Sequence, residues 1–327
     1  RKRFVLPRET RGKEAFLYFE AAMGKQEVYV NGALVRKHLG GYLPFSINLT
    51  AVHVAPGDTC LVAMIVDNSD DKSYPPGKPQ NTLDFAYHGG IYRDVWLIAK
   101  SPVSITDAVE AGHVAGGGVF VHYDRISDKS AEVFINTEVE NHDKTLRTVT
   151  VESVLENAEK KIAGKAATKI TLKAGEMRIV MQKILVKNPH LWSPDSPYLY
   201  YLSSRIKVGQ KTLDGGITRI GIRHAEFRGK DGFWLNGKPY GQLVGANRHQ
   251  DFAYVGNAVP NSQQWRDAKR LRDIGCTIIR TAHYPQDPSF MDACDELGLF
   301  VIVATPGWQY WNKDPEFAQL VQEIGRA

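Results

Sequence analysis

The chain contains 327 residues, of which 43% are hydrophobic and 24% charged, and its net charge is +5. This length allows two or three domains, and the composition is that of a globular protein able to bury sizeable cores. Lys and Arg are interspersed with acidic residues and form no clustered basic face, which argues against a nucleic-acid partner. No apolar run approaches the roughly 18–20 residues that span a membrane. The sequence therefore predicts neither a nucleic-acid-binding protein nor a membrane protein.

The three cysteines, Cys60, Cys276 and Cys294, are too few for a disulfide framework. We expect them to be buried thiols, which say little about the redox compartment. The chain begins at Arg1 without a signal peptide, which indicates a trimmed or processed protein and leaves its cellular location open.

Short apolar segments that alternate with polar residues predict β-strands along the first ~220 residues. The clearest examples are residues 15–19, 27–30 and 61–66. Asn31-Gly32 directly follows the second of these and predicts a tight hairpin turn. Many short strands at regular spacing are typical of β-sandwiches.

A domain boundary is predicted near Ser101-Pro102. Residues 91–98 form the last predicted strand before it, and a new set of strands begins after it. This second set comprises residues 119–123, 133–139, 148–155, 179–186 and 198–208. Its size, about 100 residues, is that of an immunoglobulin-like sandwich.

After residue 223 the pattern changes to alternating strands and helices. Apolar strands are predicted at residues 241–245, 276–280 and 299–304. A helix that starts at Ser262 and stops at Gly275 presents one apolar face, which comprises Trp265, Ala268, Leu271 and Ile274. A second helix is predicted from Asp287-Pro288 to Gly298, because Asp is a good cap and Pro suits the first turn.

This order of elements predicts a parallel sheet with right-handed crossovers. A doubly wound sheet and a β/α barrel both begin in this way. Because two or three units cannot close a barrel of eight strands, we favour the opening part of a larger barrel.

Ligand-binding groups of parallel β/α folds lie at the carboxyl ends of the strands. Asn247-Arg248-His249 closes the first predicted strand, and His283 lies just beyond the second. One His at a strand end more often has a structural role, but two clusters at equivalent positions favour a binding rim that suits sugar hydroxyls. Trp308 follows the third strand in an aromatic cluster, which fits sugar stacking and core packing equally well. The absence of a Gly-rich dinucleotide motif and of zinc-type His spacing argues against a redox cofactor.

Several motifs, in one order along nearly the whole chain, resemble the family 2 glycoside hydrolases and in particular their bacterial β-galactosidases. Those of the first sandwich are residues 28–32, 40–45, 67–69 and 89–95. Those of the second sandwich are residues 191–194 and 197–200, and those of the barrel are residues 245–249 and 280–285.

The resemblance implies three domains. They are a sugar-binding jelly-roll β-sandwich at residues 1–101, an immunoglobulin-like β-sandwich at residues 102–223, and the N-terminal part of a catalytic (β/α)8 TIM barrel at residues 224–327. It also implies retaining hydrolysis of terminal β-galactosides by two Glu residues ~5 Å apart, one as the acid and the other as the nucleophile. In the family these residues end the fourth and seventh barrel strands, so both are expected beyond Ala327. The chain by itself is therefore expected to be inactive, and none of its residues is named as catalytic.

Supporting roles follow from the resemblance residue by residue. His249 and His283 match positions that line the sugar subsite. Asp84 matches a sandwich residue that contacts galactose and a bound sodium ion in some members, although by pattern alone it is a solvated loop acid. Asn247 and Arg248 are expected to brace the rim more than to contact the sugar. Trp308, from the aromatic cluster, completes the set of candidate substrate-binding residues.

Two departures from the family pattern concern charge and metals. Residues 303–306 lack the Glu that binds magnesium in some members, so a magnesium site is not expected. Gln250 stands where an acid often follows the His. The resemblance implies that the reaction requires no cofactor. A sodium ion at Asp84 is the one bound metal ion that the resemblance leaves as a candidate.

Arg248 favours a β-galactosidase over a β-glucuronidase, in which Lys is usual at that position, but this distinction rests on one residue. A β-glucuronidase, a β-mannosidase and a carbohydrate-binding fragment without turnover remain alternatives. The expected partner is a carbohydrate, and a homo-oligomer is compatible with the sequence. The location is unknown, and a periplasmic or extracellular one rests only on analogy with related bacterial enzymes.

Overall fold

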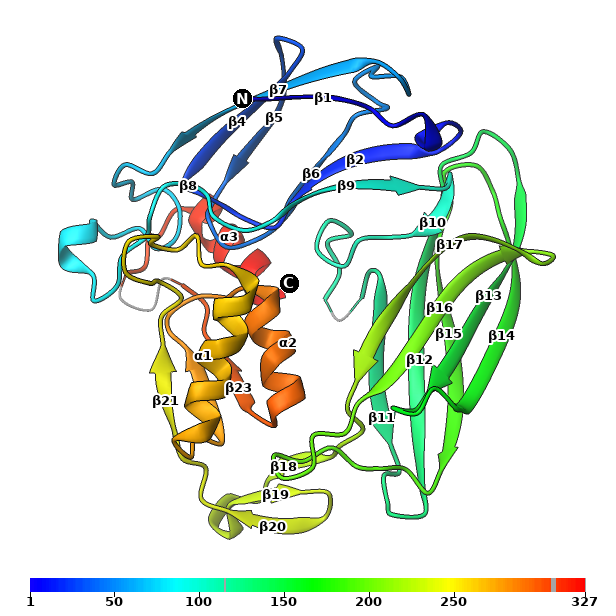
Figure 1. Cartoon of the computed structure of the whole chain (residues 1–327), viewed down its shortest axis with the longest axis vertical. Helices are drawn as coiled ribbons and strands as arrows, with labels where there is room; N and C mark the ends of the chain where they lie inside the picture. The colour runs from blue at the N-terminus through cyan, green and yellow to red at the C-terminus, as the bar shows by residue number, and fades with distance from the viewer. Residues whose placement is uncertain (115, 307–309, 327) are drawn as a thin grey trace.

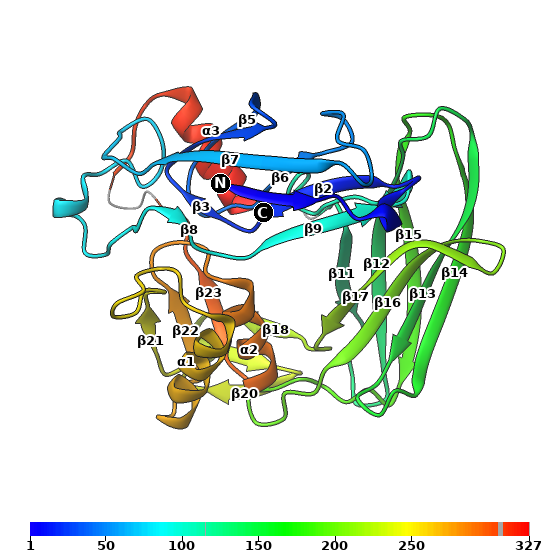
Figure 2. The same cartoon turned by 45° about the horizontal axis from the view of Figure 1, so that its top comes forward.

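The computed structural model describes residues 1–114, 116–306 and 310–326. In Figure 1, one β-sandwich runs across the top, a second stands at the right, and an α/β part lies below the first sandwich. Figure 2 shows the last helix lying against the first sandwich, away from the other helices. The three short 3-10 helices are η1 (Arg8–Thr10), η2 (Gln80–Thr82) and η3 (Gly229–Asp231).

The first sandwich is built from nine strands among the described residues: β1 (Lys2–Val5), β2 (Glu14–Phe19), β3 (Ala22–Met23), β4 (Lys25–Val30), β5 (Ala33–Leu39), β6 (Phe45–Asn48), β7 (Thr59–Asp67), β8 (Gly90–Ile91) and β9 (Val95–Lys100). Sheet β1-β7-β4-β5 faces sheet β6-β2-β9, and β3 pairs with β8. Burial alternates along β2 and β4, because successive side chains of a strand point to opposite faces. Leu17, Phe19 and Val28 are thereby placed in one core.

The hairpin predicted at Asn31-Gly32 is confirmed, since it joins the antiparallel strands β4 and β5. Asn31 has φ 49° and Gly32 has φ 90°. Positive φ at both central residues is what a type I′ turn requires, and Asn and Gly are the residues that tolerate it best.

The second sandwich follows after β9. Its strands are β10 (Val103–Ile105), β11 (Val119–Asp124), β12 (Ser130–Asn141), β13 (Arg147–Glu156), β14 (Ile162–Leu172), β15 (Met177–Lys187), β16 (Tyr200–Val208) and β17 (Lys211–Ile220). One sheet holds β10, β11 and β15 around β12, and the other has the order β14-β13-β16-β17. Ile135, Leu155 and Leu202 lie between the two sheets in one core.

The α/β part opens with an antiparallel sheet of β18 (Ala225–Phe227), β19 (Phe233–Leu235) and β20 (Lys238–Gly241). Three parallel strands follow in the order β21 (Gly245–Arg248), β22 (Ile278–Thr281) and β23 (Phe300–Val303). The helices are α1 (Asn261–Asp273), α2 (Pro288–Leu297) and α3 (Pro315–Arg326). The described residues thus contain an open parallel sheet, which fits an incomplete TIM barrel.

The first parallel strand begins later than the sequence predicted, at Gly245 instead of Gly241. Gly241 pairs with Phe233, so the preceding residues are already used by the antiparallel hairpin. Gly245 allows an unusually close approach of β21 and β22, because a Cβ there would lie 1.7 Å from the carbonyl oxygen of Ile278. A glycine is therefore required at this position.

Helix α2 follows its predicted start and stop. The Asp287 carboxylate accepts the Ser289 N–H at 2.8 Å, Pro288 occupies the first helical position, and Gly298 ends the helix with φ 76°. These are the cap residues that the sequence indicated.

The predicted apolar face of α1 is only partly correct. Ala268 and Leu271 pack into the core, whereas Trp265 is 39% exposed and Ile274 is 76% exposed. Gln264, which is not among the residues of the predicted apolar face, is buried. The reason is that the Arg248 side chain of β21 lies under this face of α1 and donates a hydrogen bond to Gln264.

The second sandwich is joined to the α/β part through Trp192, which is fully buried. Its indole N–H donates to the Asp295 carbonyl at 2.9 Å, and its ring meets Phe300 edge-on with centroids 5.3 Å apart. The Arg223 guanidinium lies 4.8 Å from the centre of the same ring. Burial raises the pKa of the Asp295 carboxyl group at this junction.

The structure shows the state of the three cysteines and the character of the described helices. Cys60, Cys276 and Cys294 are buried and unbonded to one another, as predicted, and burial raises the pKa of the Cys294 thiol to about 12. Among the described helices, none has the length and apolar character needed to cross a membrane.

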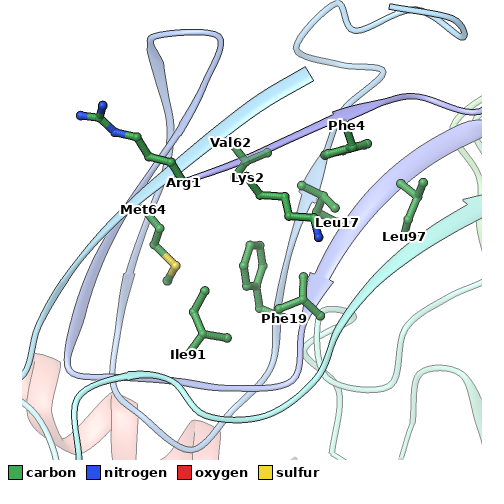
Figure 3. Close-up of a pocket in the computed structure, with 10 residues that line it drawn as sticks. Arg1, Lys2, Phe4, Leu17, Phe19, Val62, Met64, Ile91 and Leu97 are labelled. Atoms are coloured by element: carbon green, nitrogen blue, oxygen red, sulfur yellow. The ribbon is translucent and has the colours of Figure 1, made fainter. Parts of the chain in front are cut away.

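An apolar hollow of about 410 Å³ opens between the two sheets of the first sandwich (Figure 3). Phe4, Leu17 and Phe19 line it together with Met64 and Leu97. Among the described residues, Asp84, Asn247, Arg248, His249 and His283 do not line this hollow, so it is separate from the strand rim that they form.

Candidate functional site

The parallel sheet places two predicted clusters side by side. Asn247 pairs in register with Arg280, and Arg248 pairs with Thr281, at the ends of β21 and β22. Because parallel strands end at one edge, the residues that follow them share a rim. His249 follows β21 and His283 lies just after β22. Figure 2 labels the three strands β21, β22 and β23.

The two rim histidines meet. The His249 and His283 rings are 5.5 Å apart between centroids and lie nearly perpendicular to each other. Phe85 of the first sandwich contacts both, with centroids 5.8 Å from His249 and 5.7 Å from His283. Phe85 also lies 5.4 Å from Tyr284 by the same measure. The rim is therefore built from two domains.

Asp84 reaches the same place from the segment between β7 and β8. Its Oδ2 lies 3.5 Å from Nε2 of His283. The carboxylate side chain is 55% exposed, whereas the His283 side chain is 8% exposed. A hydrated acceptor thus stands beside a buried ring.

The environment of His283 fixes its hydrogen-bonding state. Nη1 of Arg280 lies 2.8 Å from Nδ1 of His283. A guanidinium can only donate, so Nδ1 accepts and the neutral ring carries its proton on Nε2. Burial lowers the pKa of His283, Arg280 lowers it further, and Asp84 opposes both. His283 therefore presents a neutral N–H toward Asp84 and the rim.

His283 also contributes to packing, because it is buried beneath the rim. The residue is only 6% exposed. Its ring fills space against Phe85 and His249, so truncation to Ala would also leave a cavity.

Arg248 lies beneath the rim. Its guanidinium donates to Gln286 Oε1 and Gln264 Oε1, both at 2.7 Å, and to Asp267 Oδ2 at 2.9 Å. It also lies 4.0 Å from the centre of the Phe290 ring. Gln286 returns a hydrogen bond to the Arg248 carbonyl. Arg248 is thus a brace between β21 and the helices, on the face of the strand opposite to Asn247.

Asn247 is on the opposite face of β21 and is exposed. It shares that face with Arg280, since the two are paired in register and side chains alternate along a strand. The remaining predicted contact, Trp308, lies outside the described residues.

Sequence reasoning missed three contributors to the site: Phe85, Arg280 and Tyr284. Phe85 is adjacent to Asp84, and the other two stand within the motif at residues 280–285, so the motifs themselves carried the signal. Tyr284 stacks on Tyr42 of the first sandwich with centroids 4.9 Å apart. The local periodicity of the sequence does not predict such a contact.

In the part of the chain that the structure covers, no cluster of three or more His, Cys, Asp or Glu side chains is suited to hold a metal ion. Asp84 supplies one carboxylate to the rim, and residues 303–306 supply none.

The fold defines two β-sandwiches followed by an open β/α sheet, and comparison with known proteins identifies the family that shares this order. The model described as the sugar binding domain of glycosyl hydrolases family 2 matches residues 1–102. The model described as glycosyl hydrolases family 2 matches residues 113–223, and that of the family 2 TIM barrel domain matches residues 227–316. The chain belongs to glycosyl hydrolase family 2.

The curated relatives of this chain include proteins named as beta-galactosidases and proteins named as beta-glucuronidases. A beta-galactosidase of Thermoanaerobacter pseudethanolicus is 36% identical over 311 residues, covering 95% of this chain and 39% of the relative. A putative beta-glucuronidase of Formosa agariphila is 34% identical over 285 residues, covering 87% of this chain and 32% of the relative. The chain therefore spans well under half the length of these relatives.

Solved structures share the architecture. A putative beta-galactosidase from Bacteroides fragilis superposes with a TM-score of 0.88 at 30% identity, covering 99% of this chain and 47% of that one. The arrangement of sandwiches and strands is thus common to both.

Proposed function

We propose that the whole protein hydrolyses terminal β-galactosides with retention of configuration, and that this chain supplies the sugar-binding part of its active site. The observation that carries the proposal is the meeting of Asp84, His249 and His283 at one strand rim. A neutral N–H donor beside a carboxylate acceptor suits the hydroxyl groups of a sugar, each of which both donates and accepts.

The charge at the rim supports a neutral sugar over a uronic acid. The half-exposed Asp84 carboxylate lies against His283, whose pKa is lowered, so the ring adds no compensating positive charge. A uronate carboxylate beside Asp84 would be repelled. Arg280 could offset this repulsion, and a relative named as a putative beta-glucuronidase keeps that activity as the second candidate.

The chemistry requires two carboxyl groups about 5–5.5 Å apart. One protonates the leaving oxygen, and the other attacks the anomeric carbon to form a glycosyl-enzyme that water then hydrolyses. We place both on barrel strands of the whole protein other than β21, β22 and β23. The 327-residue chain alone would then bind sugar without turnover, and a sodium ion would find its ligand in Asp84.

The test compares this chain with the whole protein on nitrophenyl β-galactoside, β-glucuronide and β-mannoside. The whole protein should favour the galactoside and release β-galactose first, as followed by NMR, while the short chain should be inactive. A preference for the glucuronide would replace the proposed substrate. Turnover by the short chain would refute the placement of the carboxyl groups. Replacing sodium by choline chloride should raise KM if Asp84 binds sodium.

A matched pair of variants tests the rim. His283→Asn keeps an oxygen acceptor for Arg280 but removes the Nε2 donor, so kcat/KM should fall at least tenfold. His142→Asn is the control, because His142 pairs with Glu140 at 3.1 Å on the surface of the second sandwich. Equal activity of the two variants would contradict a sugar-binding role of His283.

A further inference from the structure

Arg93 connects the first sandwich to the rim. It stands between β8 and β9, and its guanidinium reaches three oxygen atoms from three separate segments. Nη2 donates to the Pro285 carbonyl at 2.7 Å and to Gln250 Oε1 at 3.3 Å, and Nη1 donates to the Tyr42 carbonyl at 3.4 Å. All three acceptors are uncharged. The contact therefore depends on the planar, forked arrangement of the guanidinium N–H groups and not on an ion pair.

Two of these acceptors adjoin the rim histidines. Gln250 directly follows His249, and Pro285 lies two residues after His283. Gln250 is fully buried, and its Oε1 also accepts the Asp287 N–H at 3.1 Å. One side chain from the sandwich therefore holds both histidine-bearing segments to a common point.

We propose that Arg93 is a positioning residue, which acts on the sugar through the placement of His249 and His283. The effect of Arg93 on turnover rests on the proposed function. Its effect on the positions of His249 and His283 does not depend on that function. Lys cannot take over the role, because its ammonium group is a single point and cannot reproduce a planar fork that spans three segments. A displacement of about 1 Å in a binding group can cost roughly 100-fold in rate.

The experiment uses the ring signals of selectively 15N,13C-labelled histidines in the 327-residue chain. His249→Asn and His283→Asn assign the two signals. Arg93→Met removes the fork, and Arg93→Lys keeps the charge in a variant more certain to fold. Asn261→Ala is the matched control, because Asn261 Nδ2 donates across the same interface to Asp94 Oδ2 at 3.0 Å without touching either histidine segment.

Both Arg93 variants should shift the His249 and His283 signals, while Asn261→Ala leaves them in place. In the whole protein, kcat/KM should fall at least tenfold in Arg93→Met, recover only in part in Arg93→Lys, and stay within twofold of the wild type in Asn261→Ala. Unchanged histidine signals in a folded Arg93 variant, or equal shifts in Asn261→Ala, would overturn the proposal.

The histidine signals also separate this proposal from the proposed function. If they respond to Arg93 but the whole protein cleaves no β-glycoside, the positioning role stands and the function fails. If the enzyme is active and its kcat/KM is insensitive to Arg93, the function stands and the positioning role fails.

Discussion

Replacement of Arg248 by Met should destabilise the chain by about 3 kcal/mol. Met retains much of the side-chain stem but none of the donors. Gln286, Gln264 and Asp267 would each lose a charged hydrogen-bond donor at 2.7–2.9 Å. Removing one member of a buried ion pair costs about 3–5 kcal/mol, and an unpaired buried acceptor costs about 1–3 kcal/mol.

The lower end of this range applies because the Asp267 side chain is 22% exposed and can be hydrated in the variant. With about 2.1 cal/mol/K of unfolding entropy per residue, 327 residues unfolding together would lose roughly 4 °C in Tm. A unit of about 100 residues unfolding separately would lose roughly 15 °C. The size of the Tm shift thus reports whether the α/β part melts with the sandwiches.

The assay is urea unfolding followed by tryptophan fluorescence, together with a thermal melt. Arg178→Met is the control, because Arg178 pairs with Glu176 at the exposed start of β15, where such pairs contribute less than about 1 kcal/mol. Equal stability of the two variants would refute the reasoning that Arg248 is a brace.

Three further outcomes are expected. Gly245→Ala should lower stability by more than 2 kcal/mol or prevent folding, because its Cβ would collide with the Ile278 carbonyl; an unchanged Tm would contradict the close strand approach. Burial lowers the pKa of His38 from 6.5 to about 4, with Arg36 adding to the effect. The unfolded chain therefore binds the proton first, and stability should fall by up to roughly 3 kcal/mol as the pH drops from about 6.5 to about 4. His38→Phe should remove most of that loss in urea titrations at pH 7 and 4.5, and an unaltered pH dependence would exclude His38 as its source. Trp192→Ala should cost about 3–5 kcal/mol in the same unfolding assay, and a loss below 1 kcal/mol would show that the junction repacks.

Local sequence signals predicted the elements well where the physical cause was itself local. Asn31-Gly32 and Asp287-Pro288 act through the conformations and hydrogen bonds of their own backbone, so hairpin and helix start followed directly. The rim position of His249 and His283 also followed, since the ends of parallel strands meet by topology.

Contacts between distant segments could not be predicted in this way. Phe85 meets His249 across more than 160 positions of sequence, and no periodicity encodes such a pairing. His283 is buried against Phe85 and His249, which lie far from it in sequence. Helix α1 likewise buries Gln264 against Arg248 and leaves Trp265 partly exposed. Arg248 was placed at the correct strand end, but the face of the strand that it occupies emerged only from its partners on the helices.

The division of the rim between two domains bears on how this family diversifies. Because Asp84 and Phe85 come from the sandwich while the histidines come from the barrel, neither domain carries the complete rim. Under the proposed function, recombination that exchanges whole barrels between relatives would therefore combine parts of two different sugar-binding sites. A chimera that keeps its donor's substrate preference would have to inherit the loop around residue 84 along with the barrel.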